Sequence, residues 1–212
     1  MSRSVLRLFL CAFCLFAGAV HTAGGAQGPQ ARMILIFGDS LSAGYGLAQD
    51  QSWPALLAKR LDEQSLAFHV ANASISGETT RGGLARLDDA LLQFKPAVVL
   101  IALGANDGLR GLALDRMESN LREMVRKAQG RRARVLLVGM RLPPNYGPDY
   151  TARFEKVYAD IARETKAALV PFMLAGFAEK RESFLADGIH PAAGAQPLVL
   201  DNIWPALLPL LK

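Results

Sequence analysis

Hydrophobic residues along this chain follow two alternating spacings. Short β-branched and apolar runs are separated by longer stretches in which apolar residues recur every three or four positions. This pattern is typical of strands that alternate with amphipathic helices. Because the short runs are continuously apolar, they predict strands buried on both faces of a sheet. The expected strands cover residues 33–37, 68–71, 98–103, 135–138 and 168–171.

The stretches between the strands carry signals for helix starts. One helix is expected after Ser52, a residue that can cap, with Pro54 in the tolerant first turn. Another is expected to start at Asp115, with Glu118 three residues on, the spacing of a capping box. The apolar positions at helical spacing are Trp53, Leu56, Leu57 and Leu61; Leu84, Leu87 and Leu91; Met117, Leu121, Met124, Val125 and Ala128; and Phe154, Val157, Tyr158 and Ile161.

Strands that alternate with helices predict one α/β domain. Right-handed crossovers favour a three-layer α/β/α sandwich around a five-stranded parallel sheet, in the flavodoxin-like order 2-1-3-4-5. A last helix should begin near Gln196, with Pro205 bending or ending it. The proline-rich segment 142–148 is expected to be a loop, because periodic structure resumes after it. In such a sheet, ligands bind beyond the carboxyl ends of the strands.

The first residues form the pattern of a signal peptide. Two arginines and no acid precede an uncharged apolar run from residue 8 to residue 20, which is short for a membrane span. We expect residues 1–26 to be removed and residues 27–212 to form a single domain, periplasmic or secreted, without stable membrane insertion. An uncleaved anchor is the alternative, and the shift to glycine, glutamine and proline after His21 disfavours it.

Composition narrows the classes of function. Removal of Arg3 and Arg7 lowers the formal charge from +5 to +3 and no long basic run remains, so a nucleic-acid role finds no support. Both cysteines, Cys11 and Cys14, lie in the leader, so the exported domain would contain no disulfide. A His/Cys metal cluster cannot be assembled and no glycine-rich phosphate loop is present, so neither a metal nor an organic cofactor is expected.

A serine stands where the first expected strand ends. Ser40 follows Asp39 and Gly38, and the glycine allows a sharp turn out of the sheet. A hydroxyl at this point is well placed to act as a nucleophile. A serine after a strand also commonly caps a helix, so Ser40 alone leaves both roles open.

A serine nucleophile needs a base, and the chain has three histidines. His21 lies in the leader, and His69 lies within the second expected strand, where a core or edge histidine is the simpler interpretation. His190 follows the fifth strand in a loop, three residues after Asp187. On a turn, this acid can hold one ring nitrogen and leave the other to take the serine proton. The alternative is that Asp187 only caps the turn.

Two further loops carry donors for a developing oxyanion. The backbone N–H of Gly77 can approach a ligand closely, and the neutral amide of Asn106 can donate without acting as an acid. Alternatively, Gly77 is present only because its backbone angles require a glycine, and Asn106 forms a turn pair with Asp107. Convergence favours the catalytic interpretation, because all the candidates would lie at the carboxyl edge of one sheet. These candidates are Ser40, Gly77, Asn106, Asp187 and His190.

Four sequence blocks resemble the SGNH, or GDSL, hydrolase family in their order. They are Gly-Asp-Ser-Leu at 38–41, Gly77, Gly-Ala-Asn-Asp at 104–107 and Asp-Gly-Ile-His at 187–190. Further stretches at 39–45, 72–77, 106–111 and 141–147 are similar to the exported bacterial acyl-CoA thioesterase, lysophospholipase and arylesterase subgroup. The likeness runs from residue 34 to residue 197. It departs at Ala105, where relatives often have glycine, a change that would narrow or stiffen the site.

The resemblance implies a role for each candidate. Ser40 would be the nucleophile, His190 its base and Asp187 the partner of the histidine. The N–H groups of Ser40 and Gly77 and the side chain of Asn106 would form the oxyanion hole. The loop 74–80 and the segment 141–143 would border the acyl group. The residues expected to contact substrate are Ser74, Ile75, Leu109, Arg141, Leu142 and Pro143.

The expected reaction is acyl transfer from a small-molecule carboxylic ester or thioester through an acyl-enzyme. Two alternatives stay open. One is a flavodoxin-like module that binds a small ligand without turnover, which predicts no reactive serine. The other is a carbohydrate-ester deacetylase of the same family, against which the apolar residues near the site favour an acyl chain.

Overall fold

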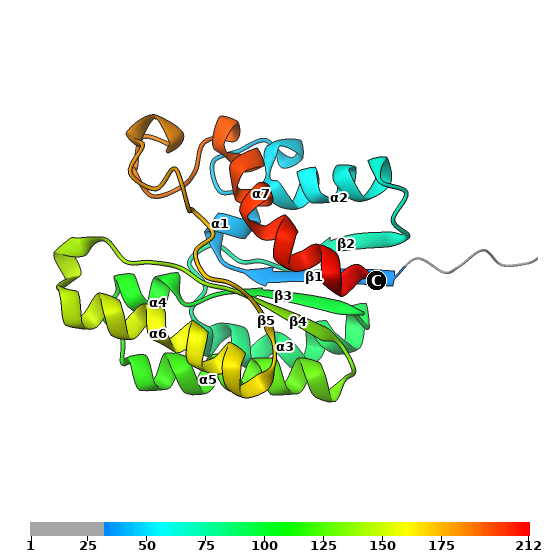
Figure 1. The fold of residues 1–212 in the computed structure, drawn as a ribbon, viewed down its shortest axis with the longest axis horizontal. Helices are drawn as coiled ribbons and strands as arrows, with labels where there is room; N and C mark the ends of the chain where they lie inside the picture. Colours follow the sequence, from blue (N-terminus) through cyan, green and yellow to red (C-terminus); the bar gives the residue numbers. More distant parts are fainter. Residues whose placement is uncertain (1–31) are drawn as a thin grey trace, which may run out of the picture.

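The computed structural model describes residues 32–212, which form a five-stranded parallel sheet between two layers of helices (Figure 1). The strand order is β2-β1-β3-β4-β5, as the sequence predicts. The expected leader, with Cys11, Cys14 and His21, lies outside the described residues. The elements are β1 Arg32–Gly38, α1 Ser40–Ala43, η1 Gln49–Gln51, α2 Trp53–Glu63, β2 Phe68–Asn72, α3 Thr80–Phe94, β3 Val98–Ala102, α4 Ala105–Leu109, α5 Leu114–Gly130, β4 Arg134–Val138, η2 Pro144–Tyr146, α6 Pro148–Thr165, β5 Ala168–Val170, η3 Arg181–Ser183, η4 Ala193–Ala195, α7 Gln196–Leu207 and η5 Leu208–Leu211.

The strand β1 lies in the interior of the sheet and is buried on both faces. Ile34 and Ile36 belong to one hydrophobic cluster, and Leu35 and Phe37 belong to the other. The division follows from the pleat, because successive side chains of a strand point to opposite faces. All four side chains have no exposed surface. The prediction that the continuous apolar runs form doubly buried strands is confirmed here.

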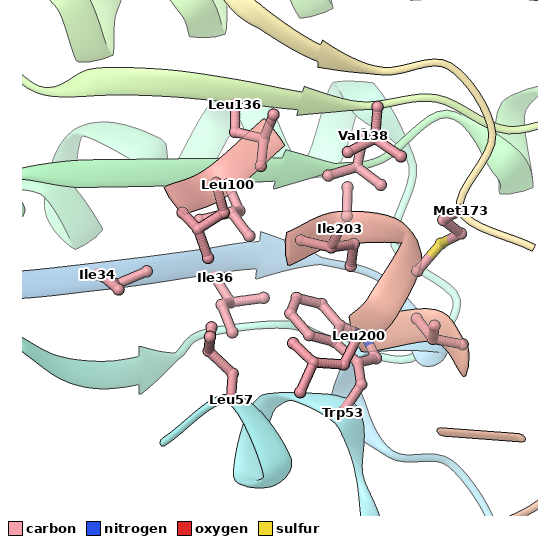
Figure 2. Close-up of a cluster of buried hydrophobic side chains, with 14 of the residues drawn as sticks. Ile34, Ile36, Trp53, Leu57, Leu100, Leu136, Val138, Met173, Leu200 and Ile203 are labelled. Atoms are coloured by element: carbon pink, nitrogen blue, oxygen red, sulfur yellow. The ribbon is translucent and has the colours of Figure 1, made fainter. Parts of the chain in front are cut away.

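The helices α2 and α7 cover one face of the sheet, and α3, α5 and α6 cover the other (Figure 1). Figure 2 shows the first cluster, in which Trp53 and Leu57 of α2 and Leu200 and Ile203 of α7 approach the strand side chains. Helical spacing in the sequence therefore identified the residues that fill the core. None of the helices within residues 32–212 is long and apolar enough to cross a membrane.

Two buried polar contacts join α2 to the segments on either side of it in space. The indole of Trp53 donates to the Leu41 carbonyl (3.2 Å), and the Trp53 backbone N–H donates to Gln196 Oε1 (2.9 Å). The same Gln196 amide donates to the Pro191 carbonyl (2.9 Å). Because Pro191 directly follows His190, Gln196 anchors the loop that carries this histidine.

One predicted helix cap is wrong, and a second has the expected position without the expected side-chain hydrogen bond. The helix α5 begins at Leu114 with Ala113 at its N-cap, so Asp115 lies inside the first turn and the Asp115–Glu118 capping box does not form. Ser52 does occupy the N-cap position of α2, but its hydroxyl donates to a carbonyl of η1 instead of accepting from the helix.

Prolines are expected to shape the segment 142–148 and the last helix. Most of the segment 142–148 is a loop, as predicted, with the single turn η2 inside it, and its last residue, Pro148, begins α6. The helix α7 continues through Pro205 to Leu207 and then tightens into η5, so Pro205 does not end the helix. A proline there removes one backbone hydrogen bond, while the buried Ile203 and Leu207 keep the helix packed on the sheet.

The strands β4 and β5 approach each other closely just beyond β4. The N–H of Gly139 donates to the Val170 carbonyl (2.7 Å). A Cβ at Gly139 would overlap the Pro171 carbonyl oxygen and lie 3.0 Å from the Val170 oxygen. Since both atoms belong to the backbone, neither can move aside without shifting β5.

We therefore predict that Gly139→Ala lowers the free energy of unfolding by about 1–3 kcal/mol, measured by chemical denaturation. Gly130→Ala is the matched control, because no atom outside the helix lies within 4 Å of its added Cβ. This control should be as stable as the wild type or slightly more stable. Equal stability of the two variants would contradict the close approach of β4 and β5.

Candidate active site

Ser40 lies at the carboxyl edge of the sheet, as the first residue of α1. Asp39 is the N-cap of this helix, and its Oδ1 accepts from the Leu41 N–H (3.1 Å). A Cβ on Gly38 would lie 2.8 Å from Ser42 Oγ and 3.0 Å from the Ala102 oxygen. Glycine thus permits the sharp exit from β1. The capping role that the sequence left open for Ser40 belongs to Asp39, which leaves the Ser40 hydroxyl available for other contacts.

The structure brings His190 and Asp187 to this serine. His190 Nε2 lies 2.8 Å from Ser40 Oγ, and His190 Nδ1 lies 2.7 Å from Asp187 Oδ2. The second oxygen, Asp187 Oδ1, accepts from the backbone N–H groups of Ile189 (2.8 Å) and His190 (3.1 Å). Asp187 therefore caps the turn and holds the ring at the same time, so its two alternative roles are compatible.

These hydrogen bonds also determine the charge of Asp187. The N–H of Ile189, the N–H of His190 and the His190 ring together lower the pKa of Asp187 to about 2. The carboxylate therefore stays ionised throughout the neutral pH range. An ionised acid on Nδ1 orients the imidazole and can stabilise the imidazolium that forms when Nε2 takes a proton.

An aromatic ring that the sequence did not single out packs against the histidine. The ring centroids of Tyr45 and His190 are 4.4 Å apart, with 36° between their planes. Tyr45 is half-exposed, at 53%. Its ring covers one face of the imidazole and restricts its rotation. The only signal for Tyr45 is its place in the stretch 39–45, and no spacing rule predicts this stacking.

A cavity of about 320 Å³ opens beside Ser40 and His190. Gly77, Ala105 and Asn106 line it. The apolar part of its wall consists of Leu41, Tyr45, Leu109, Met140 and Ile189. The chemistry of the serine therefore faces a space that suits an apolar group.

Two backbone N–H groups and one side-chain amide are candidate donors for a negative charge in this cavity. Within residues 32–212, the N–H groups of Ser40 and Gly77 have no protein acceptor. Gly77 has φ 78, in the left-handed region that favours glycine. Asn106 Nδ2 donates to the Glu78 carbonyl (3.0 Å) and, at a longer 3.4 Å, to Asp39 Oδ2. Ser40, Gly77 and Asn106 all line the cavity. An oxyanion in acyl transfer forms next to the nucleophilic oxygen and needs donors of this kind.

The six residues expected to contact substrate differ in where they lie relative to this cavity. Of the six residues, only Leu109 lines the cavity. Leu142 is 8% exposed and joins the hydrophobic cluster that contains Phe154, because the segment after β4 packs under α6. Arg141 pairs with Glu155 (3.1 Å) outside the cavity. The remaining residues, which also lie outside the cavity wall, are Ser74, Ile75 and Pro143.

Two buried carboxylates lie behind the site. Burial raises the pKa of Asp39 to about 7; the charge of Asp107 adds to the rise, and hydrogen bonds, led by that from Leu41, oppose it. Asp107 is 3% exposed, and it accepts from the Thr80 N–H (2.8 Å) and the Thr80 hydroxyl (2.6 Å) at the start of α3. Asp107 thus joins α4 to α3 instead of forming a simple turn pair with Asn106.

His69 takes no part in this arrangement. It is exposed on the edge strand β2, opposite Met33 in the first half of β1. Of the two structural interpretations, a core or an edge histidine, the structure shows the edge one. Within the described part of the chain, no group of three or more His, Cys, Asp and Glu side chains is placed to hold a metal ion.

Known proteins resemble this chain in sequence and in fold. Residues 36–196 match the GDSL-like Lipase/Acylhydrolase family. The esterase TesA of Pseudomonas aeruginosa is 49% identical, over 93% of this chain and 98% of its own length. The arylesterase of Vibrio mimicus is 43% identical, over 80% and 85% of the two chains. Thioesterase 1/protease 1/lysophospholipase L1 of Escherichia coli K12 is 41% identical, over 84% and 85%. A crystal structure of TesA agrees with a TM-score of 0.83 at 51% identity, covering 84% of this chain and 99% of that chain.

The pKa of Asp39 leads to a prediction about stability. In the unfolded chain an aspartate has a pKa of about 4, and in the folded protein Asp39 has a pKa of about 7. Between these values the folded state binds more protons than the unfolded state. The stabilising contribution of protonated Asp39 is therefore fully present below pH 4 and is lost as the pH rises towards 7. The expected loss is on the order of a few kcal/mol.

We predict that Asp39→Asn flattens the dependence of unfolding free energy on pH between 4 and 7, because its amide does not ionise. Chemical denaturation at several pH values measures this. Parallel curves for the variant and the wild type would contradict the assigned cost of burying this charge.

Proposed function

Because the chain belongs to the GDSL-like lipase/acylhydrolase family, we propose that Ser40, His190 and Asp187 form the catalytic triad of an esterase and thioesterase. The observation that carries the proposal is the pair of contacts through the His190 ring, 2.7 Å to Asp187 Oδ2 and 2.8 Å to Ser40 Oγ. Relatives are named esterase, arylesterase and thioesterase/lysophospholipase, and the chain is accordingly a carboxylic ester hydrolase.

The first step is attack by the serine. His190 Nε2 accepts the proton of Ser40 Oγ as this oxygen bonds to the substrate carbonyl carbon. The positive charge that forms on the imidazole is stabilised by the ionised Asp187 on the opposite nitrogen. The low pKa of Asp187 supports this role, since the carboxylate remains charged while the histidine cycles between its two states.

The negative charge on the carbonyl oxygen is stabilised by the donors opposite the histidine. We assign this role to the N–H groups of Ser40 and Gly77 and to Asn106 Nδ2. The contact of Asn106 to Asp39 is long at 3.4 Å, so this N–H can turn to a stronger acceptor when an oxyanion forms. Collapse of the intermediate transfers the proton from His190 to the leaving alcohol or thiol, and water then releases the acyl group by the same route.

The cavity supports an acyl chain as the bound group. Leu109, Met140 and Ile189 offer apolar contact within its volume of about 320 Å³. An apolar wall of this kind favours a small-molecule acyl ester or thioester over the polar surface of a carbohydrate ester. The proposed triad favours an enzyme over a module that only binds a ligand, because such a module has no need of a reactive serine.

We also propose that the catalytic domain spans residues 27–212 and acts outside the cytoplasm, in the periplasm or secreted. The support is the charge and hydropathy pattern of residues 1–26. The modest formal charge of +3 after their removal gives no basis for a nucleic-acid partner.

We predict that Ser40→Ala lowers kcat for p-nitrophenyl butyrate and octanoate by roughly 10⁴-fold or more and abolishes labelling by a fluorophosphonate. The physical reason is the loss of the hydroxyl oxygen that lies 2.8 Å from His190 Nε2. Ser183→Ala, a serine in η3 outside the cavity, is the control and should behave as wild type. Turnover or labelling that survives in Ser40→Ala would show that another residue is the nucleophile.

For Asn106→Ala we predict a fall in kcat of about 10²–10³-fold with a nearly unchanged KM, because the lost donor acts chiefly in the transition state. Steady-state hydrolysis of the same esters measures both constants. A kcat within twofold of the wild type would remove Asn106 from the oxyanion hole and leave the triad assignment intact.

A further inference from the structure

Arg86, in the second turn of α3, reaches back to the loop that follows β2. Its Nε donates to Glu78 Oε2 (2.6 Å), and its Nη1 donates to the Ala73 carbonyl (2.8 Å). These two contacts hold opposite ends of the segment 73–78. Gly77, which lines the cavity and whose N–H has no acceptor among residues 32–212, lies between them.

The guanidinium of Arg86 is itself held in place. Its Cζ lies 3.9 Å from the ring centroid of Phe37, which is fully buried in β1. The side chains of Arg86 and Glu78 are only 25% and 12% exposed, so solvent and salt screen their attraction less than they would a surface pair. Arg86 Nη2 is buried without an acceptor among residues 32–212, which shows that this position is kept at some cost to hydrogen bonding.

The same segment orients the second oxyanion donor. The backbone carbonyl of Glu78, next to the held carboxylate, accepts from Asn106 Nδ2 (3.0 Å). The carbonyl of Gly77 accepts from Nη2 of Arg110 (3.0 Å), the residue that follows α4. Movement of Glu78 would therefore change both the placement of the Gly77 N–H and the orientation of the Asn106 amide.

We propose that Arg86 and Glu78 form a clamp that positions the oxyanion donors Gly77 and Asn106, and that Arg86 is a positioning residue for acyl transfer. The proposal rests on the proposed function, since it assumes that these two donors act on the oxyanion. A loosened clamp leaves the contacts of Ser40 with His190 intact and misplaces the donors. The expected loss is therefore in kcat, with substrate binding largely unchanged.

The chain offers a variant that loosens the clamp without removing either charge. A Cβ at Gly82 would collide with Glu78 Oε1, the free end of a flexible side chain. Gly82→Ala should therefore displace the Glu78 carboxylate from Arg86. Because alanine favours a helix interior over glycine, α3 itself should remain folded.

The test compares Gly82→Ala, Glu78→Gln and Arg86→Lys with the wild type. Lysine keeps the charge of arginine but lacks the fork that reaches two acceptors. Arg81→Ala is the matched control, since Arg81 is an exposed arginine on the same helix outside the clamp. The measurements are kcat and KM for p-nitrophenyl butyrate, the rate of fluorophosphonate labelling at Ser40, the pH profile of kcat/KM and the thermal unfolding midpoint.

We expect each clamp variant to lose roughly tenfold in kcat and in labelling rate, less than the loss on removing Asn106 itself. KM should stay within about twofold, the pH profile should keep its shape, and Arg86→Lys combined with Glu78→Gln should lose no more than the worse single variant. Arg81→Ala should match the wild type in every measurement.

Full kcat and labelling rate in folded Gly82→Ala and Glu78→Gln would overturn the clamp, as would variants that lose thermal stability alone. A wild type without turnover or labelling would instead overturn the proposed function. The two failures are distinguishable, because in this second case the Arg81→Ala control would be inactive too.

Discussion

The burial of β1 between two parallel neighbours is the constraint on which the rest of the site depends. Gly38, the last residue of β1, pairs in register with Ala102 at the end of β3, and β2 flanks the other side. Because parallel strands end at the same edge, the loops that follow them meet there. Ser40, Gly77 and Asn106 come from these three loops, so their convergence is a consequence of strand pairing.

The polar residues at the carboxyl edge of the sheet, where the proposed reaction takes place, also lower the stability of the fold. Asp39 is 2% exposed, and burial raises its pKa to about 7, so the fold retains a carboxyl group that it does not easily ionise. The same residue caps the helix that begins with Ser40 and contacts Asn106. Asp107 and Arg86 add further buried polar contacts behind the cavity. Stability is given up at this edge for fixed positions of a few donors, as is common where a site must be preorganised.

Much of this arrangement could be predicted from the sequence, because apolar spacing reports on burial directly. The five strands and the turn that joins Asp187 to His190 follow from patterns within short segments, and the strand order follows from the handedness of the crossovers. Features that depend on how distant segments approach one another could not be found in this way. Leu142 belongs to a loop next to the expected site, yet it packs in the hydrophobic core with residues of α6. Tyr45 packs against His190, although no short-range rule joins the two rings. The helix α5 begins one residue before Asp115, at the buried Leu114, so the expected cap does not form.

The central claim is that Ser40 Oγ forms a bond to the acyl carbon while three donors hold the oxygen. A crystal structure of the protein after reaction with a phosphonate tests it most directly, because the tetrahedral phosphorus resembles the intermediate. The account predicts phosphorus bonded to Ser40 Oγ, with one phosphonyl oxygen about 3 Å from the N–H groups of Ser40 and Gly77 and from Asn106 Nδ2. Phosphorus on another residue, or a phosphonyl oxygen turned to solvent away from these donors, would contradict it.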